Sequence, residues 1–296
     1  LARQLAERGL PLLAGAQYTR GGWRHHVAVE IALNAQGLDG EWSQLDLSAM
    51  GAIAACKARM VRLDSRVPAG AELRFARWAP PAGRKGTVCV FTGRSEQIEK
   101  YFETVRDLRD RGFAVAMIDW RGQGHSSRRL RDPRKGYVRD FADFEIDVET
   151  FVQQVVLPDC PPPYFALAHS MGGAVMLRIA HAGKRWFDRM VLSAPMIDLP
   201  GRATSLAAVA LLRTLRLTGQ GGRYVPGGSD ALTGSESFVN NPFTSDPVRF
   251  ARNAAILEED PTLGLGSPTV AWADTAVRTM RGFRAANYPL QIRQPI

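Results

Sequence analysis

The sequence predicts an α/β protein whose mostly parallel sheet is doubly wound, with helices on both faces. Continuous apolar runs at 87–91 and 113–119 are typical of strands that are buried on both faces. Amphipathic segments at 98–112 and 141–156 alternate with these runs, and strands that alternate with helices form parallel sheets. Ligands of such sheets bind at the carboxyl ends of the strands, so the residues that follow each strand are the ones to examine.

The other core elements follow from their own local patterns. The segment E-L-R-F-A-R-W-A at 72–79 alternates between apolar and polar residues, which predicts an edge strand. Gly112 is expected to cap the helix that precedes it. Further along, the pattern predicts a strand at 164–168, a helix at 171–182 and a strand at 189–195.

The rhythm of strands and helices divides the chain into four parts. These are an N-terminal segment of unknown role at 1–66, a core at 67–195, an inserted cap or lid at 196–288, and the start of a returning core strand at 289–296. In the first part, 48–60 is Ala-rich and predicts a helix, and we interpret the tandem His25-His26 as surface residues. No carboxylate or cysteine lies at ligand spacing from these histidines, so no metal site is predicted.

Composition limits the classes of partner. The net charge of +9 favours anionic partners, but the arginines are spread along the chain without a nucleic-acid-binding motif, so we expect no nucleic acid. An anionic membrane surface fits the charge better. The three cysteines form no C-x-x-C pair, which predicts inert thiols in a reducing compartment and a cytoplasmic protein. No apolar run is long enough to cross a bilayer.

The segment A-H-S-M-G at 168–172 is the most informative stretch of the sequence. A serine hydroxyl needs a base and oxyanion donors to act as a nucleophile, and a sharp strand–turn–helix with small neighbours can present it. Ser170 has a predicted strand before it and a predicted helix after it. The alternative is a serine that only caps a helix. Gly172 and Gly173 favour the nucleophile, because glycines weaken a helix unless close approach requires them.

Two neighbouring loops complete the predicted site. The loop F-T-G-R-S-E follows the strand at 87–91, and Gly93 lets it turn so that the Arg94 N–H can join the Met171 N–H in stabilising an oxyanion. A plain turn is the alternative. The loop D-W-R-G-Q-G-H-S follows the next strand and matches neither common phosphate-binding pattern. We interpret it as a tight turn beneath the site, anchored by Asp119.

Four segments together resemble one family. F-T-G-R-S-E-Q-I-E-K-Y, I-D-W-R-G-Q-G-H-S, A-H-S-M-G-G-A and L-S-A-P-M, in this order, are similar to segments of bacterial lysophospholipases and of related monoacylglycerol lipases among α/β-hydrolases. N-P-F-T-S-D-P-V-R-F in the insertion is similar too. The resemblance covers 71–296. It implies an α/β-hydrolase fold, Ser170 as nucleophile, Arg94 and Met171 as oxyanion donors, and a cap that shapes a lipid pocket. Thr92-Gly93 replaces the common H-G, as in the lysophospholipase branch.

The rest of a catalytic triad is not evident. An α/β-hydrolase places an acid and then a histidine after the serine, but only His181 follows Ser170, and it lies eleven residues along the same predicted helix. His169 adjoins the serine, but neighbours in a sharp turn point apart, and His125 precedes it on another loop. Asp260 and Asp274 fall inside the cap. We therefore expect the acid and the histidine beyond Ile296, in a chain truncated at its C-terminus.

The sequence thus predicts a serine hydrolase that cleaves carboxylic esters of monoacyl lipids, most simply lysophospholipids, without metal or cofactor. A general carboxylesterase, monoacylglycerol lipase, thioesterase or peptidase on the same fold is the first alternative. A non-catalytic binding protein that keeps the serine turn is the second. The apolar helix around Leu206–Leu217 is interpreted as ordinary cap packing, with transient contact to an anionic inner-membrane surface as the alternative.

Overall fold

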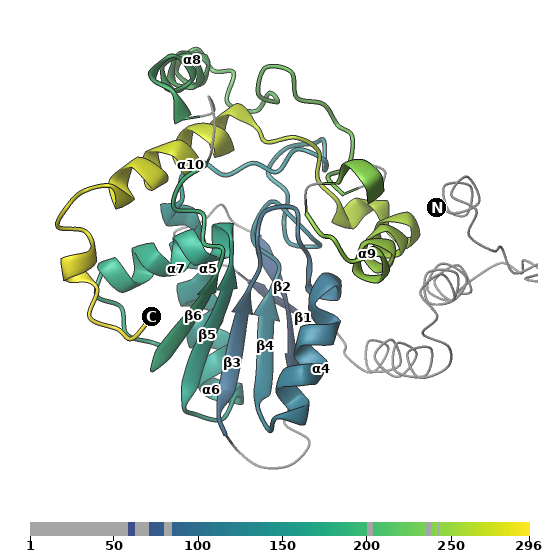
Figure 1. The fold of residues 1–296 in the computed structure, drawn as a ribbon, viewed down its shortest axis with the longest axis vertical. Helices are drawn as coiled ribbons and strands as arrows, with labels where there is room; N and C mark the ends of the chain where they lie inside the picture. The colour runs from purple at the N-terminus through teal and green to yellow at the C-terminus, as the bar shows by residue number, and fades with distance from the viewer. Residues whose placement is uncertain (1–58, 63–70, 80–84, 200–203, 235–237, 242) are drawn as a thin grey trace, which may run out of the picture.

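The computed structural model describes residues 59–62, 71–79, 85–199, 204–234, 238–241 and 243–296 (Figure 1). Its centre is a six-stranded sheet in the order β1-β2-β4-β3-β5-β6. The strands are β1 Arg59–Arg62, β2 Glu72–Trp78, β3 Thr87–Phe91, β4 Ala114–Ile118, β5 Tyr164–His169 and β6 Arg189–Ser193. The four strands β3 to β6 are parallel, whereas β1 and β2 run antiparallel to their neighbours. The predicted mostly parallel α/β sheet is confirmed.

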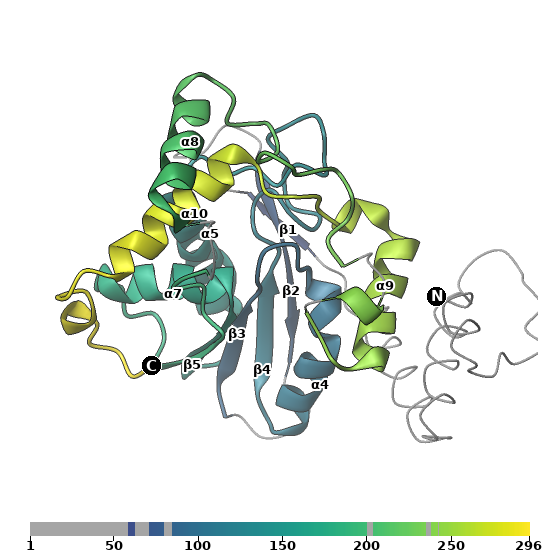
Figure 2. The same cartoon turned by 45° about the horizontal axis from the view of Figure 1, so that its top comes forward.

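Helices cover both faces of this sheet (Figures 1 and 2). On one side lies α4, preceded by a short 3-10 turn η1; on the other lie α5, its π-helical continuation η2, and α7. The bounds in the core are η1 Ile98–Tyr101, α4 Phe102–Asp110, α5 Ala142–Phe151, η2 Val152–Val156, α6 Leu157–Asp159 and α7 Met171–His181. Gly112 follows α4 with a φ of 89°, as expected for a glycine that ends a helix.

The alternation of side chains along β3 builds two cores. Cys89 and Phe91 face α5 and α7, where Phe91 packs against the rings of Trp120 and Phe187, both 5.7 Å away between centroids. Val88 and Val90 face α4 on the opposite side. Each fully buried aromatic or branched side chain contributes about 1.5–3 kcal/mol of hydrophobic stabilisation. This double burial explains why β3 reads as an unbroken apolar run.

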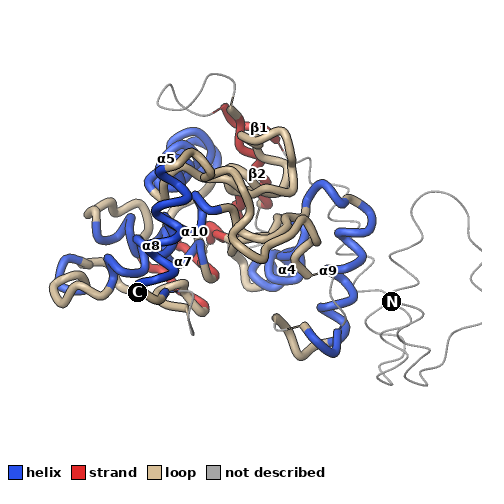
Figure 3. Tube along the Cα trace, turned by 90° about the horizontal axis from the view of Figure 1, so that it is seen from above, coloured by secondary structure: helices blue, strands red, loops and turns tan. Residues whose placement is uncertain are grey.

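The predicted insertion supplies the helices that lie over the carboxyl ends of the strands. Its elements are α8 Leu206–Leu217, η4 Phe238–Asn240, α9 Pro247–Glu259, η5 Pro261–Leu263 and α10 Val270–Phe283. Seen from above, α8 and α10 lie on the side of α7, and α9 lies on the side of α4 (Figure 3). The two sides therefore flank the loops that end β3, β4 and β5.

The two sides of the cap attach to different parts of the core, and the apolar share of the contact is described for α10. Helix α10 buries Trp272 against Phe141, and the hydroxyl of Thr275 accepts a hydrogen bond of 3.1 Å from the Phe141 N–H. Helix α9 is held to α4 by ion pairs, because the Glu103 carboxylate accepts hydrogen bonds from Arg249 at 3.0 Å and from Arg252 at 2.9 Å.

The N-terminal edge of the sheet differs from the sequence prediction. Strand β2 is not an edge strand, because β1 pairs with it, and β1 overlaps the end of the helix predicted at 48–60. The sheet therefore extends into the segment 1–66 that was set apart from the core. Four residues are too few for a hydrophobic period to be visible. The rest of that helix, and His25 and His26, lie outside the described residues.

The segment 289–296 does not form the predicted strand. It contains the 3-10 helix η6 Pro289–Gln291 and then runs irregularly, with one backbone hydrogen bond of 3.0 Å from the Met190 N–H to the Pro295 carbonyl. Prolines at 289 and 295 lack the N–H groups that a strand ladder needs. The ring of Tyr288 also stacks on His181, with 3.9 Å between centroids, which turns the chain toward α7.

Candidate active site

The turn at Ser170 has the strained geometry expected of a presented nucleophile. Ser170 has a φ of 49° and a ψ of −114°. Residues other than glycine rarely adopt this backbone conformation. Three backbone hydrogen bonds hold it there. The Ser170 N–H donates to the Ser193 carbonyl at 3.1 Å, and the Ser170 carbonyl accepts from the Met196 N–H at 2.9 Å and from the Ala174 N–H at 3.1 Å. The Ser170 side chain makes no capping hydrogen bond to α7. The geometry therefore argues against a simple helix cap.

The glycines after the serine allow the close approach that the sequence suggested. A Cβ atom at Gly172 would lie 2.4 Å from the Phe91 carbonyl oxygen and 2.7 Å from that of Thr92. A Cβ atom at Gly173 would lie 2.7 Å from the Cβ of Pro195. Real Cβ contacts are not this short, so the start of α7 can rest on the ends of β3 and β6 only if both positions lack side chains.

Two backbone N–H groups lie in the segments where the sequence placed oxyanion donors. Met171 is the first residue of α7, so its N–H precedes the helical hydrogen-bond ladder. Among the described residues, the Arg94 N–H has no hydrogen-bond partner. Gly93 allows the turn beside it, since a Cβ there would lie 2.8 Å from the Glu96 carboxylate and 3.1 Å from His169. Ser95 has a φ of 60°, which adds strain to this loop.

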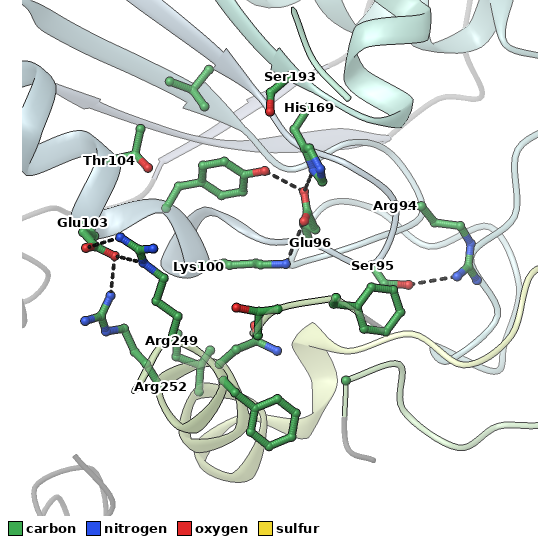
Figure 4. A pocket seen from close by; sticks show the side chains of 18 of the residues that line it. Arg94, Ser95, Glu96, Lys100, Glu103, Thr104, His169, Ser193, Arg249 and Arg252 are labelled. Atoms are coloured by element: carbon green, nitrogen blue, oxygen red, sulfur yellow. Dashed lines mark hydrogen bonds and ion pairs between the residues drawn. The ribbon is translucent and has the colours of Figure 1, made fainter. Parts of the chain in front are cut away.

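Glu96 holds the loop that follows β3 in place, and it is not among the site residues predicted from the sequence. Its carboxylate accepts hydrogen bonds from the Gly93 N–H at 2.5 Å, the Tyr101 hydroxyl at 2.7 Å and the Lys100 ammonium at 2.7 Å, and it lies 3.0 Å from His169 Nδ1 (Figure 4). Burial raises the pKa of Glu96, but His169 and Lys100 outweigh burial and hold it at about 2. The spacing of Lys100 and Tyr101, four and five residues on, was the available signal.

The Asp119 carboxylate is hydrogen-bonded to the loop that follows β4. This buried carboxylate accepts hydrogen bonds from Arg74 Nε at 2.6 Å, from the Ile98 N–H at 3.0 Å and from the His125 N–H at 2.9 Å. Gly124 leaves room for it, since a Cβ there would lie 2.1 Å from the carboxylate. Burial raises the pKa of Asp119 although the Arg74 charge opposes the change. The residue supports the site from beneath.

A cavity of about 600 Å³ lies between the core and the side of the cap formed by α9. Ala168, His169 and Ser193 line it from the sheet, so it adjoins the Ser170 turn. Its wall combines apolar groups, including Leu167, Phe243, Phe250 and Ile256, with the charged groups drawn in Figure 4. A space of this volume accommodates a ligand that is partly apolar and partly polar.

The described histidines do not pair with Ser170. His169 bonds to Glu96, and His125 lies 2.7 Å from Asp260 in a half-exposed pair that joins the loop after β4 to the cap. His181 stacks on Tyr288 at the far end of α7. Asp274 is engaged by Arg216 and Arg278. Within the described part of the chain, neither a triad base at Ser170 nor a group of metal-ligating side chains is assembled.

Comparison with known proteins places this arrangement in a family. The family described as serine aminopeptidase, S33, matches residues 82–292 of the chain. The chain belongs to this family. It is 35% identical to lysophospholipase L2 of Escherichia coli strain K12 over 193 residues, which make up 64% of this chain and 56% of that protein. It is 30% identical to monoglyceride lipase of Mus musculus over 150 residues, or 50% of this chain and 48% of that protein.

These relatives confirm the resemblance to bacterial lysophospholipases and monoacylglycerol lipases, and solved structures confirm the fold of this S33 family member. The chain spans about half the length of the curated relatives it matches. A carboxyl esterase from Bacillus coagulans has a TM-score of 0.60 at 19% identity, covering 80% of this chain and 76% of that one. A soluble variant of monoglyceride lipase from Saccharomyces cerevisiae has a TM-score of 0.57 at 21% identity, covering 79% and 71%. The fold is that of an α/β-hydrolase.

The close contact at Gly172 predicts a stability penalty for the smallest possible side chain. Gly172→Ala should lower the free energy of unfolding by about 1–3 kcal/mol, because the new Cβ meets backbone oxygens that cannot rotate away. The matched control is Gly282→Ala in α10, where a Cβ meets nothing within 4 Å, and it should stabilise the protein by about 0.5–1 kcal/mol. Urea unfolding of both variants checks this, and equal effects at the two positions would contradict it.

The Glu96 network predicts a dependence of stability on pH. Because the folded-state pKa of Glu96 is about 2, below its ordinary value of 4.5, its ionised form stabilises the fold above pH 4.5, and this stabilisation is lost as the pH falls toward 2. The difference in unfolding free energy between the wild type and Glu96→Gln should therefore shrink by up to about 3 kcal/mol between pH 6 and pH 2. Urea unfolding at a series of pH values measures it.

The control for this experiment is Asp107→Asn, which removes an exposed carboxylate from α4. Its difference from the wild type should stay constant over the same pH range. A constant difference for Glu96→Gln as well would show that the Glu96 carboxylate does not couple protonation to folding.

Proposed function

We propose that this chain is a serine hydrolase with Ser170 as its nucleophile, which cleaves the carboxylic ester of a monoacyl lipid, with a lysophospholipid as substrate. The strained Ser170 turn carries the proposal, because a conformation that costs about 1–3 kcal/mol persists where it presents a reacting group. The Ser170 hydroxyl is free of helix capping, and the Met171 and Arg94 N–H groups belong to the two segments that meet beside it.

The chemistry follows from these groups. Ser170 Oγ attacks the acyl carbonyl carbon while a general base accepts its proton, and the carbonyl oxygen becomes an oxyanion. The Met171 and Arg94 N–H groups donate hydrogen bonds to that oxyanion. Collapse of the intermediate expels the glycerol oxygen of the lipid, which takes up a proton, and leaves an acyl group on Ser170. Water then hydrolyses the acyl-enzyme by the same steps in reverse order.

The choice of a lipid ester has two supports. Relatives of this chain carry the names lysophospholipase L2 and monoglyceride lipase, and both names denote action on lipids with one acyl chain. The cavity beside Ser170 offers apolar side chains to an acyl chain and charged side chains to a headgroup. A carboxylesterase, a thioesterase or a binding protein without catalysis remains the alternative that the experiments below distinguish.

Replacing the serine tests the nucleophile. In the full chain, Ser170→Ala should lower ester hydrolysis by at least about 1,000-fold, because no other group can form the acyl-enzyme. The matched control is Ser193→Ala, which removes a hydroxyl that lines the same cavity from the end of β6. Initial rates on a lysophospholipid, a monoacylglycerol and a short acyl thioester measure both variants. Retention of activity in Ser170→Ala would refute the nucleophile, and a preference for the thioester would refute the substrate class.

We also propose that α8 contacts an anionic membrane surface. Leu206 and Leu217 are 77% and 72% exposed, and they lie with Ala210 and Arg213 on one stripe of the helix, at positions i, i+4, i+7 and i+11. Ordinary packing accounts for Leu212 on the inner side but not for this stripe. An apolar stripe with a cation suits the interface of an anionic bilayer. None of the described helices has the length and apolarity to cross a bilayer.

Vesicle binding tests this contact. The double substitution Leu206→Gln with Leu217→Gln should lower the partition coefficient onto vesicles that contain phosphatidylglycerol by at least about 30-fold, because each leucine loses about 1–2 kcal/mol of burial. The control is Leu290→Gln, which changes a leucine that is 80% exposed in η6. Co-sedimentation measures both. Equal binding of the wild type and the double variant would exclude α8 as the contact.

A further inference from the structure

The cationic side chains that line the cavity differ in whether they pair with a carboxylate. Among the described residues, four cationic side chains line it, and three of them have a carboxylate partner: Lys100 pairs with Glu96, and Arg249 and Arg252 both pair with Glu103. Arg94, by contrast, has no carboxylate within ion-pair distance in the described part of the chain. In Figure 4, Arg249 and Arg252 contact the Glu103 carboxylate, whereas Arg94 contacts the Ser95 hydroxyl.

The Arg94 guanidinium is held firmly although its charge is not compensated. Its Nη1 donates to the Ser95 hydroxyl at 2.9 Å, its Nη2 donates to the Gly266 carbonyl at 2.7 Å, and its centre lies 5.2 Å from the Trp272 ring. Its Nε atom is buried and has no hydrogen-bond partner. A guanidinium has five N–H bonds, and two of them donate in these contacts. The other three donate to none of the described residues.

Such an arrangement is costly unless a ligand completes it. Burial lowers the pKa of Arg94 to about 10, so the guanidinium is still protonated at neutral pH. One water in the cavity of about 10 Å³ bounded by Arg94, Arg121 and Trp272 would satisfy Nε, but it would leave the charge without a partner. A partly buried cation without an anion, in the wall of a cavity, is a mark of a binding site.

We infer that the Arg94 side chain binds the phosphate of the substrate and so selects lysophospholipids over neutral monoacylglycerols. This inference rests on the proposed function. A guanidinium fits a phosphate because two parallel N–H groups can meet two phosphate oxygens. The backbone N–H of Arg94 also donates to the oxyanion. One residue therefore contacts both the acyl carbonyl oxygen and the phosphate of the substrate. Its side chain therefore determines specificity, while its backbone serves the reaction.

The covalent distances agree with this double role. From the backbone nitrogen of an arginine to the central carbon of its guanidinium there are about six bonds. From the carbonyl carbon of a 1-acyl lysophospholipid, through the glycerol, to the phosphorus there are also about six bonds. A lipid whose carbonyl oxygen meets the Arg94 N–H can thus place its phosphate beside the guanidinium of the same residue. A monoacylglycerol has only a hydroxyl at that distance.

Binding of short ether analogues tests the inference, since an ether cannot be cleaved and a hexyl chain stays monomeric. In the full chain with Ser170→Ala, calorimetry measures the Kd of 1-O-hexylglycerophosphocholine, 1-O-hexylglycerol and inorganic phosphate. Adding Arg94→Met should weaken the phosphocholine ether by about 10- to 100-fold and change the neutral ether by less than about twofold, because only the phosphate loses charge-assisted hydrogen bonds. Arg94→Lys, which keeps the charge but not the fork, should fall between.

The control is Arg278→Met, which removes a cation of α10 that does not line the cavity and that already pairs with Asp140. It should change the affinity for the phosphocholine ether by less than about twofold. Equal weakening of both ethers by Arg94→Met, or of neither, overturns the inference and leaves the lipid function standing. Inorganic phosphate that binds as tightly as the phosphocholine ether overturns it too, because the anion site would then not belong to a lipid.

Failure of the underlying function gives a different result. If the parent protein binds neither ether, the lipid-ester function is wrong and the inference falls with it. Melting temperatures of all variants check folding. If Arg94→Met does not fold, Arg94→Lys decides: an unchanged preference for the phosphocholine ether over the neutral ether overturns the role of the guanidinium.

Discussion

The buried carboxylate of Asp119 is the fixed point to which the active-site loops are tied. It sits at the end of β4, takes the side chain of Arg74 from β2, and accepts N–H groups from the start of η1 and from the loop that contains His125. A buried charge is tolerable only when such partners surround it, so the partners cannot drift apart without exposing it to an apolar interior. The segment between Gly93 and η1 carries Arg94 and Glu96, and its position therefore follows from Asp119.

Strain and close contact at the Ser170 turn have the same physical origin. The chain must reverse from β5 into α7 within one residue while α7 rests on the backbone of β3. Missing side chains at Gly172 and Gly173 make the contact possible, and backbone hydrogen bonds to Ser193 and Met196 keep Ser170 in its unfavourable conformation. The rigid sheet thus fixes the position of Ser170, and the surrounding loops place polar groups around it.

Much of this could be predicted from the sequence because it depends on local patterns. Buried parallel strands appear in the sequence as apolar runs, and Gly112 indicates the end of a helix. The residues around Ser170 predict a strand–turn–helix. Glu96 was missed because its partner His169, 73 residues away in the sequence, comes beside it only after β3 and β5 pair. The four-residue strand β1 has no period to detect, and the tail at 289–296 was assigned as a strand although its prolines and the stacking of Tyr288 on His181 favour a turn.

The two attachments of the cap have unequal sensitivity to the surrounding solution. Ion pairs tether α9, and dissolved salt screens partly exposed charges over about 10 Å at 0.1 M. Apolar contacts around Trp272 tether α10 in addition to the ion pair between Arg278 and Asp140, and salt does not weaken the apolar contacts. A rise in ionic strength therefore weakens the ion pairs of α9 but not the apolar contacts of Trp272, the residue that also contacts Arg94. Salt concentration therefore affects the α9 side of the cavity wall more than the contact between Trp272 and Arg94.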